Sequence, residues 1–329
     1  MIVSLLIVVF VLSFVLTFVV KKYAKRMSII DIPNDRSSHT VPTPRGGGLA
    51  IVIAWFAGIF FLFFVDLIET DLFYALLGAV PLMVVGIIDD SVDVKPIIRI
   101  LIQSFSTIWA LWFLGGLPEI DFGFYSFSNI YINNILIFFV ILWFINLFNF
   151  IDGIDGYLAS GVLLFSIALF VITNNIIPLI SAATVAGFLI WNWHPAKIFM
   201  GDVGSTVLGY NFIVLAVYFQ NSENISFVIP IILSSVFWFD ATFTLFRRFL
   251  NKEKLNRPHK KHAYQRLTQA GFSHQKVVIL FIFVNVIIIG IAYFSYLHSK
   301  YILVSFFSVI FLLFIITKLI DRKKPFKSE

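Results

Sequence analysis

The sequence has no cysteine and little charge. Of its 329 residues, only 13% are Asp, Glu, Lys or Arg, whereas a soluble protein carries roughly 25%. The absence of cysteine excludes a disulfide scaffold and any cysteine-ligated metal or iron–sulfur site. The scarcity of charge, together with 60% hydrophobic residues, excludes an ordinary soluble domain and a disordered chain.

Long apolar runs recur along the whole chain. A helix needs about 20 mostly apolar residues to cross a bilayer, so these runs predict an all-α, polytopic membrane bundle that forms one domain over residues 1–329. The first run is followed by basic residues without a small-residue cleavage site, so we expect a retained helix rather than a signal peptide. The runs predict eleven membrane helices, at residues 2–20, 47–65, 72–88, 97–114, 133–150, 157–173, 176–193, 203–220, 226–246, 276–297 and 301–319.

The positions of Lys and Arg predict an orientation in the membrane. Strict alternation of eleven helices places every Lys and Arg except Lys300 on one side. The positive-inside rule then puts the N-terminus outside and the C-terminus in the cytoplasm. The net charge of +6 is explained by this topology, so no nucleic acid partner is expected. The main cytoplasmic loops are predicted at residues 21–46, 89–96, 151–156, 194–202 and 247–275.

Acidic and amide side chains gather in the second, third and fourth of these loops. The adjacent Asp89 and Asp90 repel each other, which a divalent cation or a bound proton would relieve. Asn149 and Asp152 share one helix face, and hard oxygen donors of this kind suit Mg²⁺. Asp202 precedes a helix that it could cap or beside which it could bind metal. Solvated helix caps and ligand-free turns are the alternatives.

Basic residues dominate the first and fifth loops. Arg45 precedes the glycine run 46–48 that opens a helix, a pattern typical of a phosphate cradle, although a flexible loop is the alternative. In the fifth loop, His259, His262 and Arg266 suit a diphosphate, unless they serve only the topology or attract anionic lipid. Groups for a cation and for phosphate on one face predict phosphoryl transfer, with a transporter of an anionic solute as the alternative.

Five motifs occur in order on the predicted cytoplasmic face. They are D-x-P-N-x-R at 31–36, P-R-G-G-G at 44–48, G-I-I-D-D at 86–90, N-x-x-N-x-x-D-G-x-D-G at 146–156, and N-x-H-P-A-x-x-F-M-G-D-V-G-S at 192–205. As a set they resemble the polyprenyl-phosphate N-acetylhexosamine-1-phosphate transferases of glycosyltransferase family 4. That family includes the phospho-N-acetylmuramoyl-pentapeptide transferase of peptidoglycan synthesis. The eleven-helix pattern resembles the branch that initiates O-antigen and other surface polysaccharides.

The resemblance implies a reaction and its partners. An N-acetylhexosamine 1-phosphate would pass from a UDP-N-acetylsugar to undecaprenyl phosphate, which releases UMP and leaves an undecaprenyl-diphosphate sugar. The implied cofactor is Mg²⁺, with Mn²⁺ as the alternative. The implied location is the bacterial inner membrane, among membrane lipids, with the active site in a cytoplasmic groove. The chain would act alone or as a homodimer, and the product would start a surface or cell-wall polymer.

The resemblance also implies roles for individual residues. The positions that match the Mg²⁺ site are Asp202 and Asn149. Those that match catalytic acids are Asp89 and Asp90, one of them as the base near the lipid phosphate, and Asp152. The matched nucleotide pocket consists of Asp155, Asn192 and Phe199, the last stacking on uracil. Phosphate or sugar contacts are implied for Arg45, Arg99, His259, His262 and Arg266.

The sequence departs from the family pattern in two places. The common branch has an H-x-H-H cluster in the fifth loop, whereas this chain has H-A-Y-Q-R at 262–266. The variant resembles a subgroup that uses other N-acetylated sugars, such as N-acetyl-fucosamine or N-acetyl-quinovosamine, and it makes the peptidoglycan substrate a poor match. The second departure is Lys95-Pro96 after the acidic pair, and no role is assigned to Lys95.

Overall fold

Helices account for almost all of the regular structure in this computed structural model, which describes residues 1–24, 30–33, 41–92, 94–255, 257 and 259–326. The motif residues Asn34 and Arg36 lie outside these ranges. Within them the α-helices are α1 Ile2–Ala24, α2 Gly48–Phe64, α3 Thr70–Leu77, α4 Ala79–Asp89, α5 Pro96–Leu114, α6 Ile130–Ile151, α7 Tyr157–Thr173, α8 Ile176–Asn192, α9 Asp202–Ser222, α10 Val228–Leu233, α11 Ser235–Leu250, α12 Ala263–Gln269, α13 His274–Leu297 and α14 Ile302–Lys323.

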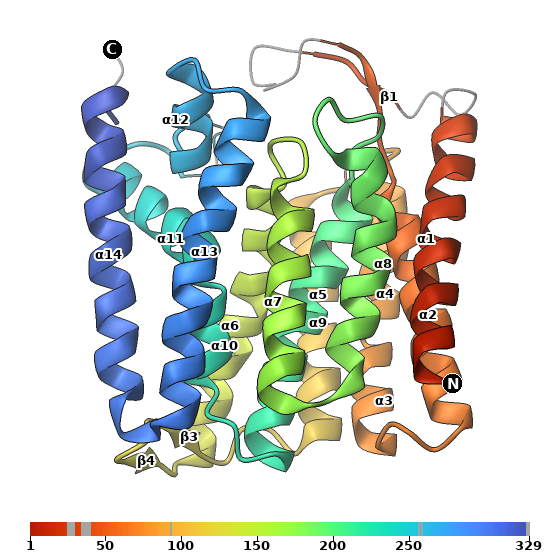
Figure 1. Cartoon of the computed structure of the whole chain (residues 1–329), viewed down its shortest axis with the longest axis vertical. Helices are drawn as coiled ribbons and strands as arrows, with labels where there is room; N and C mark the ends of the chain where they lie inside the picture. Colours follow the sequence, from red (N-terminus) through yellow and green to blue (C-terminus); the bar gives the residue numbers. More distant parts are fainter. Residues whose placement is uncertain (25–29, 34–40, 93, 256, 258, 327–329) are drawn as a thin grey trace.

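Two short hairpins and one turn of 3₁₀-helix complete the described structure. Strand β1 (Ile30–Asp31) pairs antiparallel with β2 (Thr43–Pro44), and β3 (Ile120–Asp121) with β4 (Ser126–Phe127). The 3₁₀-helix η1, Ser299–Tyr301, joins α13 to α14. The long helices lie side by side, with β1, α12 and the last turn of α14 at one end of the molecule and β3 and β4 at the other (Figure 1).

Except for α12, which lies in the predicted loop 247–275, the α-helices coincide with the predicted apolar segments, two of which are each divided into a pair of helices. Within the part of the chain that the structure describes, seven helical runs can cross a membrane by length and composition: Ile2–Ala24, Thr70–Asp89, Pro96–Leu114, Ile130–Ile151, Asp202–Ser222, His274–Leu297 and Ser299–Lys323. Three shorter apolar helices are α2, α7 and α8. The chain is therefore an all-α polytopic membrane protein, as the apolar runs predict.

Both divided segments contain a proline, and each divides at a small residue. In segment 72–88, α3 ends at Gly78, and Pro81 then lacks the N–H that would bond to the Leu77 carbonyl. A side chain at Gly78 would collide with the Tyr210 hydroxyl, which donates to the Ala75 carbonyl at 2.7 Å. Helices α10 and α11 meet at Ser234, whose hydroxyl donates to a backbone carbonyl of the preceding turn at 2.9 Å.

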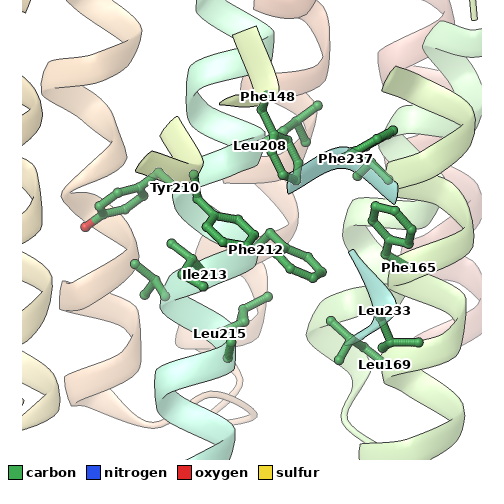
Figure 2. Packing of buried hydrophobic residues seen from close by; sticks show 14 of the residues in the cluster. Phe148, Phe165, Leu169, Leu208, Tyr210, Phe212, Ile213, Leu215, Leu233 and Phe237 are labelled. Carbon is green, nitrogen blue, oxygen red and sulfur yellow. The ribbon is translucent and has the colours of Figure 1, made fainter. Parts of the chain in front are cut away.

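Helix α9 is the centre of the bundle. Nearly all of its residues are buried, and it packs against α2, α4 and α6. Phe212 of α9 lies 5.9 Å from Phe148 and 5.8 Å from Phe165, measured between ring centroids, and Phe165 lies 5.1 Å from Phe237 (Figure 2). These separations are favourable for aromatic pairs, so the rings join four helices around the core. The buried α9 begins at Asp202, which is therefore held in a fixed place.

Candidate functional site

Three carboxylates and two guanidinium groups converge at the ends of four different elements. Asp89 and Asp90 end α4, Arg99 lies in the first turns of α5, Asp202 starts α9, and Arg45 follows β2. Arg99 Nη1 lies 2.6 Å from Asp89 Oδ2 and 3.5 Å from Asp202 Oδ2. Arg45 Nε lies 3.0 Å from Asp90 Oδ1, and its Nη2 pairs with Asp202 Oδ1. We call these five residues the charged cluster.

Glycines let the first loop come close enough to place Arg45 in this cluster. The backbone nitrogens of Gly47 and Gly48 donate to the carbonyls of Phe199 and Met200 at 2.9 and 2.8 Å. A Cβ atom on Gly48 would collide with the backbone of Gly204 in the first turn of α9. The glycine run thus ties the start of α2 to the start of α9, rather than cradling a phosphate by itself.

The carboxylates of the charged cluster are more buried than its guanidinium groups. The side chains of Asp90 and Asp89 are 5% and 8% exposed, against 35% for Arg45 and 33% for Arg99. The arginines can therefore meet an incoming anion while they hold the carboxylates in place. Burial raises the pKa of Asp90 to about 6, against the opposing effect of the Arg45 charge.

Asn149 and Asp152 extend the cluster from the end of α6. The Asn149 amide nitrogen donates to the Ser205 hydroxyl at 3.2 Å, which leaves its carbonyl oxygen available as a ligand. Burial raises the pKa of Asp152 to about 7; the charge of Arg45 opposes the shift, whereas the charges of Asp202 and Asp90 add to it.

A cavity of about 20 Å³ lies between Asp89, Asn149 and Asp202. Since roughly 10–15 Å³ suffices for one water, this cavity has room for a single small ion. In addition, the buried Oδ2 of Asp90 has no hydrogen-bond partner within the described part of the chain. The donor set consists of hard oxygens, which is the chemistry that Mg²⁺ prefers. Asp202 and Asn149, which match the magnesium site of the family, therefore have the ligand chemistry and the space to hold a magnesium ion.

Asp155 belongs to a second group of polar side chains. Its Oδ2 lies 2.6 Å from His194 Nδ1, 3.1 Å from the backbone nitrogen of Ala196 and 3.4 Å from His274 Nδ1. Burial acts to raise the pKa of Asp155, but the hydrogen bonds from His274 and His194 outweigh it and hold the pKa below its usual value. We call Asp155, His194 and His274 the Asp155 network.

Asn192 is the last residue of α8, and Phe199 lies in the loop after it, together with His194. The Asn192 side chain accepts from the Gly156 nitrogen and donates to the Ile198 carbonyl, both at 3.0 Å, so it joins the third loop to the fourth. The Phe199 nitrogen donates to the Pro44 carbonyl at 2.8 Å. Its ring is half-buried. The three residues matched to a nucleotide pocket therefore occupy neighbouring loops.

The fifth-loop residues have partners of their own. Arg266 is buried and its Nη1 lies 2.5 Å from Asp321 Oδ1, while His262 Nδ1 lies 3.8 Å from Asp240 Oδ1. Burial, followed by the charge of His262, lowers the pKa of His259 to about 4, so this ring is neutral at pH 7. Over the ranges that the structure describes, no hydrogen bond or ion pair joins these residues to the charged cluster. For Arg266 to contact a diphosphate, its ion pair would have to open.

Comparison with known proteins identifies the family of this chain. A model of glycosyl transferase family 4 matches residues 72–220. The probable undecaprenyl-phosphate N-acetylglucosaminyl 1-phosphate transferase of Bacillus subtilis (strain 168) is 33% identical, over 98% of this chain and 95% of the relative. The chain belongs to glycosyl transferase family 4. This membership decides between the transferase and the transporter interpretations in favour of a membrane transferase.

Other family 4 relatives cover most of the chain at lower identity. The undecaprenyl-phosphate alpha-N-acetylglucosaminyl 1-phosphate transferase of Escherichia coli O157:H7 is 28% identical, over 94% of this chain and 89% of its own. The decaprenyl-phosphate N-acetylglucosaminephosphotransferase of Mycobacterium leprae (strain TN) is 25% identical, over 82% of this chain and 77% of the relative. The residues matched by the family 4 model include Asp89, Asn149 and Asp202 but neither Arg45 nor His274.

Sequence reasoning missed His194 and His274 as members of the site. His194 lies inside a motif that marks the family 4 resemblance, and its place in that loop is the signal that could have drawn attention to it. His274 is a single histidine at the start of an apolar helix, with no motif around it. Only the tertiary structure brings it to Asp155.

Proposed function

We propose that the chain transfers N-acetylglucosamine 1-phosphate from UDP-N-acetylglucosamine to undecaprenyl phosphate, releasing UMP and starting a surface polymer. The observation that carries this proposal is the charged cluster, in which buried acids and arginines that are about one-third exposed meet where α4 ends and α9 begins. Phosphoryl transfer needs mainly positioning and charge neutralisation, and this arrangement offers both. The names of the relatives supply the substrates.

In the proposed reaction an oxygen of the lipid phosphate attacks the sugar-bearing phosphorus. A new P–O bond forms to the lipid, the P–O bond to UMP breaks, and UMP leaves with the electron pair. Arg45 and Arg99 bind and orient the phosphates, because their side chains are about one-third exposed and already face the carboxylates. Asp89 or Asp90 removes a proton from the lipid phosphate.

Mg²⁺ is the cofactor that this site fits, with Mn²⁺ as the alternative. Asp202 and Asn149 would hold it, next to the cavity that both residues line with Asp89. When bound, it supplies positive charge that neutralises the diphosphate.

An apolar groove of about 640 Å³ suits the polyprenyl chain. It lies between α6 and α11, and its lining includes Val140, Trp143 and Phe144 of α6 together with Trp238 of α11. Phe144 precedes Asn149 by five residues, which is about 8 Å along a helix. In this proposal the lipid tail lies in the groove, and its phosphate extends along α6 to the charged cluster.

The fifth-loop sequence and the names of the relatives indicate different donor sugars. The H-A-Y-Q-R sequence resembles enzymes for N-acetyl-fucosamine or N-acetyl-quinovosamine, whereas the names of the similar proteins specify N-acetylglucosamine. We favour N-acetylglucosamine, because the Bacillus relative aligns with nearly the whole chain. In this proposal Asp155, Asn192 and Phe199 hold the nucleoside.

The proposal includes an orientation. All eleven apolar segments would cross the bacterial inner membrane, with the N-terminus outside and the charged cluster on the cytoplasmic side, where UDP-sugars are present. The alternation is supported by β1 and α12, which belong to two of the predicted cytoplasmic loops and lie at the same end of the bundle (Figure 1). Cysteine labelling from outside intact cells tests it: a cysteine at Lys300 should react and one at Lys95 should not.

A substrate panel tests the reaction. Purified protein with Mg²⁺ and undecaprenyl phosphate is given UDP-N-acetylglucosamine, UDP-N-acetyl-fucosamine or UDP-N-acetyl-quinovosamine, and UMP is measured. We expect UMP with the first donor. Release with only the other donors would contradict the sugar assignment, and no release with any donor would contradict the transferase proposal.

A single-turnover incubation tests direct attack. The protein is mixed with Mg²⁺ and UDP-N-acetylglucosamine without lipid acceptor, and direct attack predicts no burst of UMP. UMP equal in amount to the enzyme would instead indicate a covalent aspartyl intermediate.

A further inference from the structure

The His274 side chain contacts both the backbone and the side chain of Asp155. Its Nδ1 atom lies 3.4 Å from the Asp155 backbone nitrogen and 3.4 Å from Asp155 Oδ2. One neutral tautomer accepts from the backbone N–H, and the other donates to the carboxylate. Either form therefore ties the first residue of α13 to the loop between α6 and α7.

The two histidines of the Asp155 network differ in accessibility. The His194 side chain is 35% exposed, whereas that of His274 is 11% exposed and that of Asp155 is 8% exposed. His194 can meet a ligand with the ring edge opposite Asp155. His274 is largely covered; it contacts Asp155, and its ring lies beside the His194 ring, at 5.2 Å between centroids. It is placed to act through Asp155.

The geometry is that of a hydrogen-bonded network rather than a transition-metal site. Two ligands of one tetrahedral zinc ion are separated by about 3.3 Å, given zinc–nitrogen distances near 2.0–2.1 Å. The His194 to Asp155 separation of 2.6 Å is shorter than this, and the same Oδ2 also accepts from the Ala196 nitrogen at 3.1 Å. The carboxylate oxygen is thus already fully engaged by hydrogen-bond donors.

The corner between α12 and α13 contacts the segment from the end of α6 to the start of α7 at two points. Tyr264 of α12 donates to the Phe150 carbonyl at 2.9 Å, and a Cβ atom on Gly153 would collide with the same hydroxyl. At the other end of the corner, His274 reaches Asp155. The C-terminal helices therefore hold the segment that precedes α7 from both sides.

We propose that His274 is a positioning residue for nucleotide binding: it fixes Asp155 and, through it, His194, so that the nucleotide pocket is formed before the UDP-sugar arrives. This inference rests on the proposed function, since it takes Asp155 to be part of the nucleotide pocket. The depressed pKa of Asp155 supports it, because the network keeps the carboxylate ionised. A fixed pocket avoids the entropy of ordering the loop during binding.

The test compares three variants at one helix. His274→Leu removes the polar contact, His274→Asn keeps a donor and an acceptor near the position of Nδ1, and His298→Leu is the matched control at the other end of α13. Steady-state UMP release gives kcat and the KM for each substrate. Calorimetric titration with UMP gives a dissociation constant that does not depend on turnover, and thermal unfolding in detergent reports folding.

We expect His274→Leu to raise the KM for UDP-N-acetylglucosamine and the dissociation constant of UMP by about tenfold, as the loss of one hydrogen bond to a charged group predicts. Its kcat and its KM for undecaprenyl phosphate should stay within about twofold, and His274→Asn and His298→Leu should resemble the wild type. An unchanged UMP affinity in His274→Leu would overturn the proposal, and so would a loss of UMP affinity in His274→Asn as large as that in His274→Leu. If His274→Leu does not fold, His274→Phe, which keeps a ring but has neither donor nor acceptor, takes its place with the same expected result. Wild-type protein that releases no UMP would contradict the proposed function, whereas an active wild type with an unaffected leucine variant would contradict only the role of His274.

Discussion

Asp321 joins the C-terminal helix to the fifth loop, and its replacement tests whether Arg266 is structural. The carboxylate accepts hydrogen bonds from both terminal nitrogens of Arg247, each at 3.0 Å, and from Nη1 of Arg266 at 2.5 Å. Arg266 is 3% exposed and also donates to the Lys324 carbonyl at 3.0 Å. The guanidinium carbon of Arg247 lies 3.8 Å from the centre of the Phe326 ring. Asp321→Asn keeps the shape of the side chain and removes its charge.

The expected cost follows from the burial of these groups. Removing one partner of a fully buried ion pair costs about 3–5 kcal/mol, because the other charge is left uncompensated. Asp321 and Arg247 are 19% and 18% exposed, and water screens part of this loss, so we expect a reduction of about 2–4 kcal/mol in the free energy of unfolding. For a chain of this size that corresponds to a fall of roughly 3–6 °C in the midpoint of thermal unfolding.

Thermal unfolding in detergent measures the effect, with Asp71→Asn as the control. Asp71 is exposed in the first turn of α3, so its replacement should cost no more than about 1 kcal/mol. Arg266→Met should lower the free energy of unfolding by a similar amount. The loss in the double variant should be smaller than the sum of the two single losses, because both substitutions remove the same ion pair. An unchanged midpoint in Arg266→Met, together with a raised KM for the UDP-sugar, would refute this reasoning and show that Arg266 binds the diphosphate.

Three further predictions concern the charged cluster, the helix crossing and the groove. Asp202→Asn should lower UMP release at least roughly a hundredfold at saturating Mg²⁺, and chelation by EDTA should abolish wild-type release until Mg²⁺ is restored; full activity in either case would contradict a metal role. Gly48→Ala should reduce stability by about 1–3 kcal/mol in thermal unfolding, because its Cβ meets the Gly204 backbone, whereas Gly290→Ala enters open space and should not. Val140→Asn in the groove should raise the KM for undecaprenyl phosphate roughly tenfold in UMP-release assays and leave the KM for the UDP-sugar unchanged; equal changes in both would argue against a lipid groove.

The helices could be predicted from the sequence because hydrophobic runs in a membrane protein carry a strong signal. Segment 133–150, for example, lies within α6 at Ile130–Ile151. The breaks within two segments could not be placed as readily. Gly78 ends α3 where Tyr210 from a distant helix fills the space, and no local pattern reveals that contact. Propensity alone leaves a glycine inside an apolar helix ambiguous.

Most of the charged cluster could also be anticipated, because acidic and basic residues at predicted helix ends on one side have few explanations other than function. The pairing within it could not. The sequence assigned Arg45 and Arg266 to phosphate alike, yet Arg45 reaches Asp202 whereas Arg266 is buried against Asp321. Asp321 lies in a basic C-terminal stretch that the topology already explained, so nothing in its neighbourhood marked it as a partner.

The fate of the β-phosphate tests the central claim most directly. Purified protein with Mg²⁺ and undecaprenyl phosphate is given UDP-N-acetylglucosamine labelled with ³²P at the phosphate next to the sugar, and the lipid and aqueous phases are separated. Sugar-1-phosphate transfer predicts that the label enters the lipid phase, one for one with unlabelled UMP in the aqueous phase. Label that remains in the aqueous phase as UDP would show transfer of the sugar without its phosphate and would contradict the account.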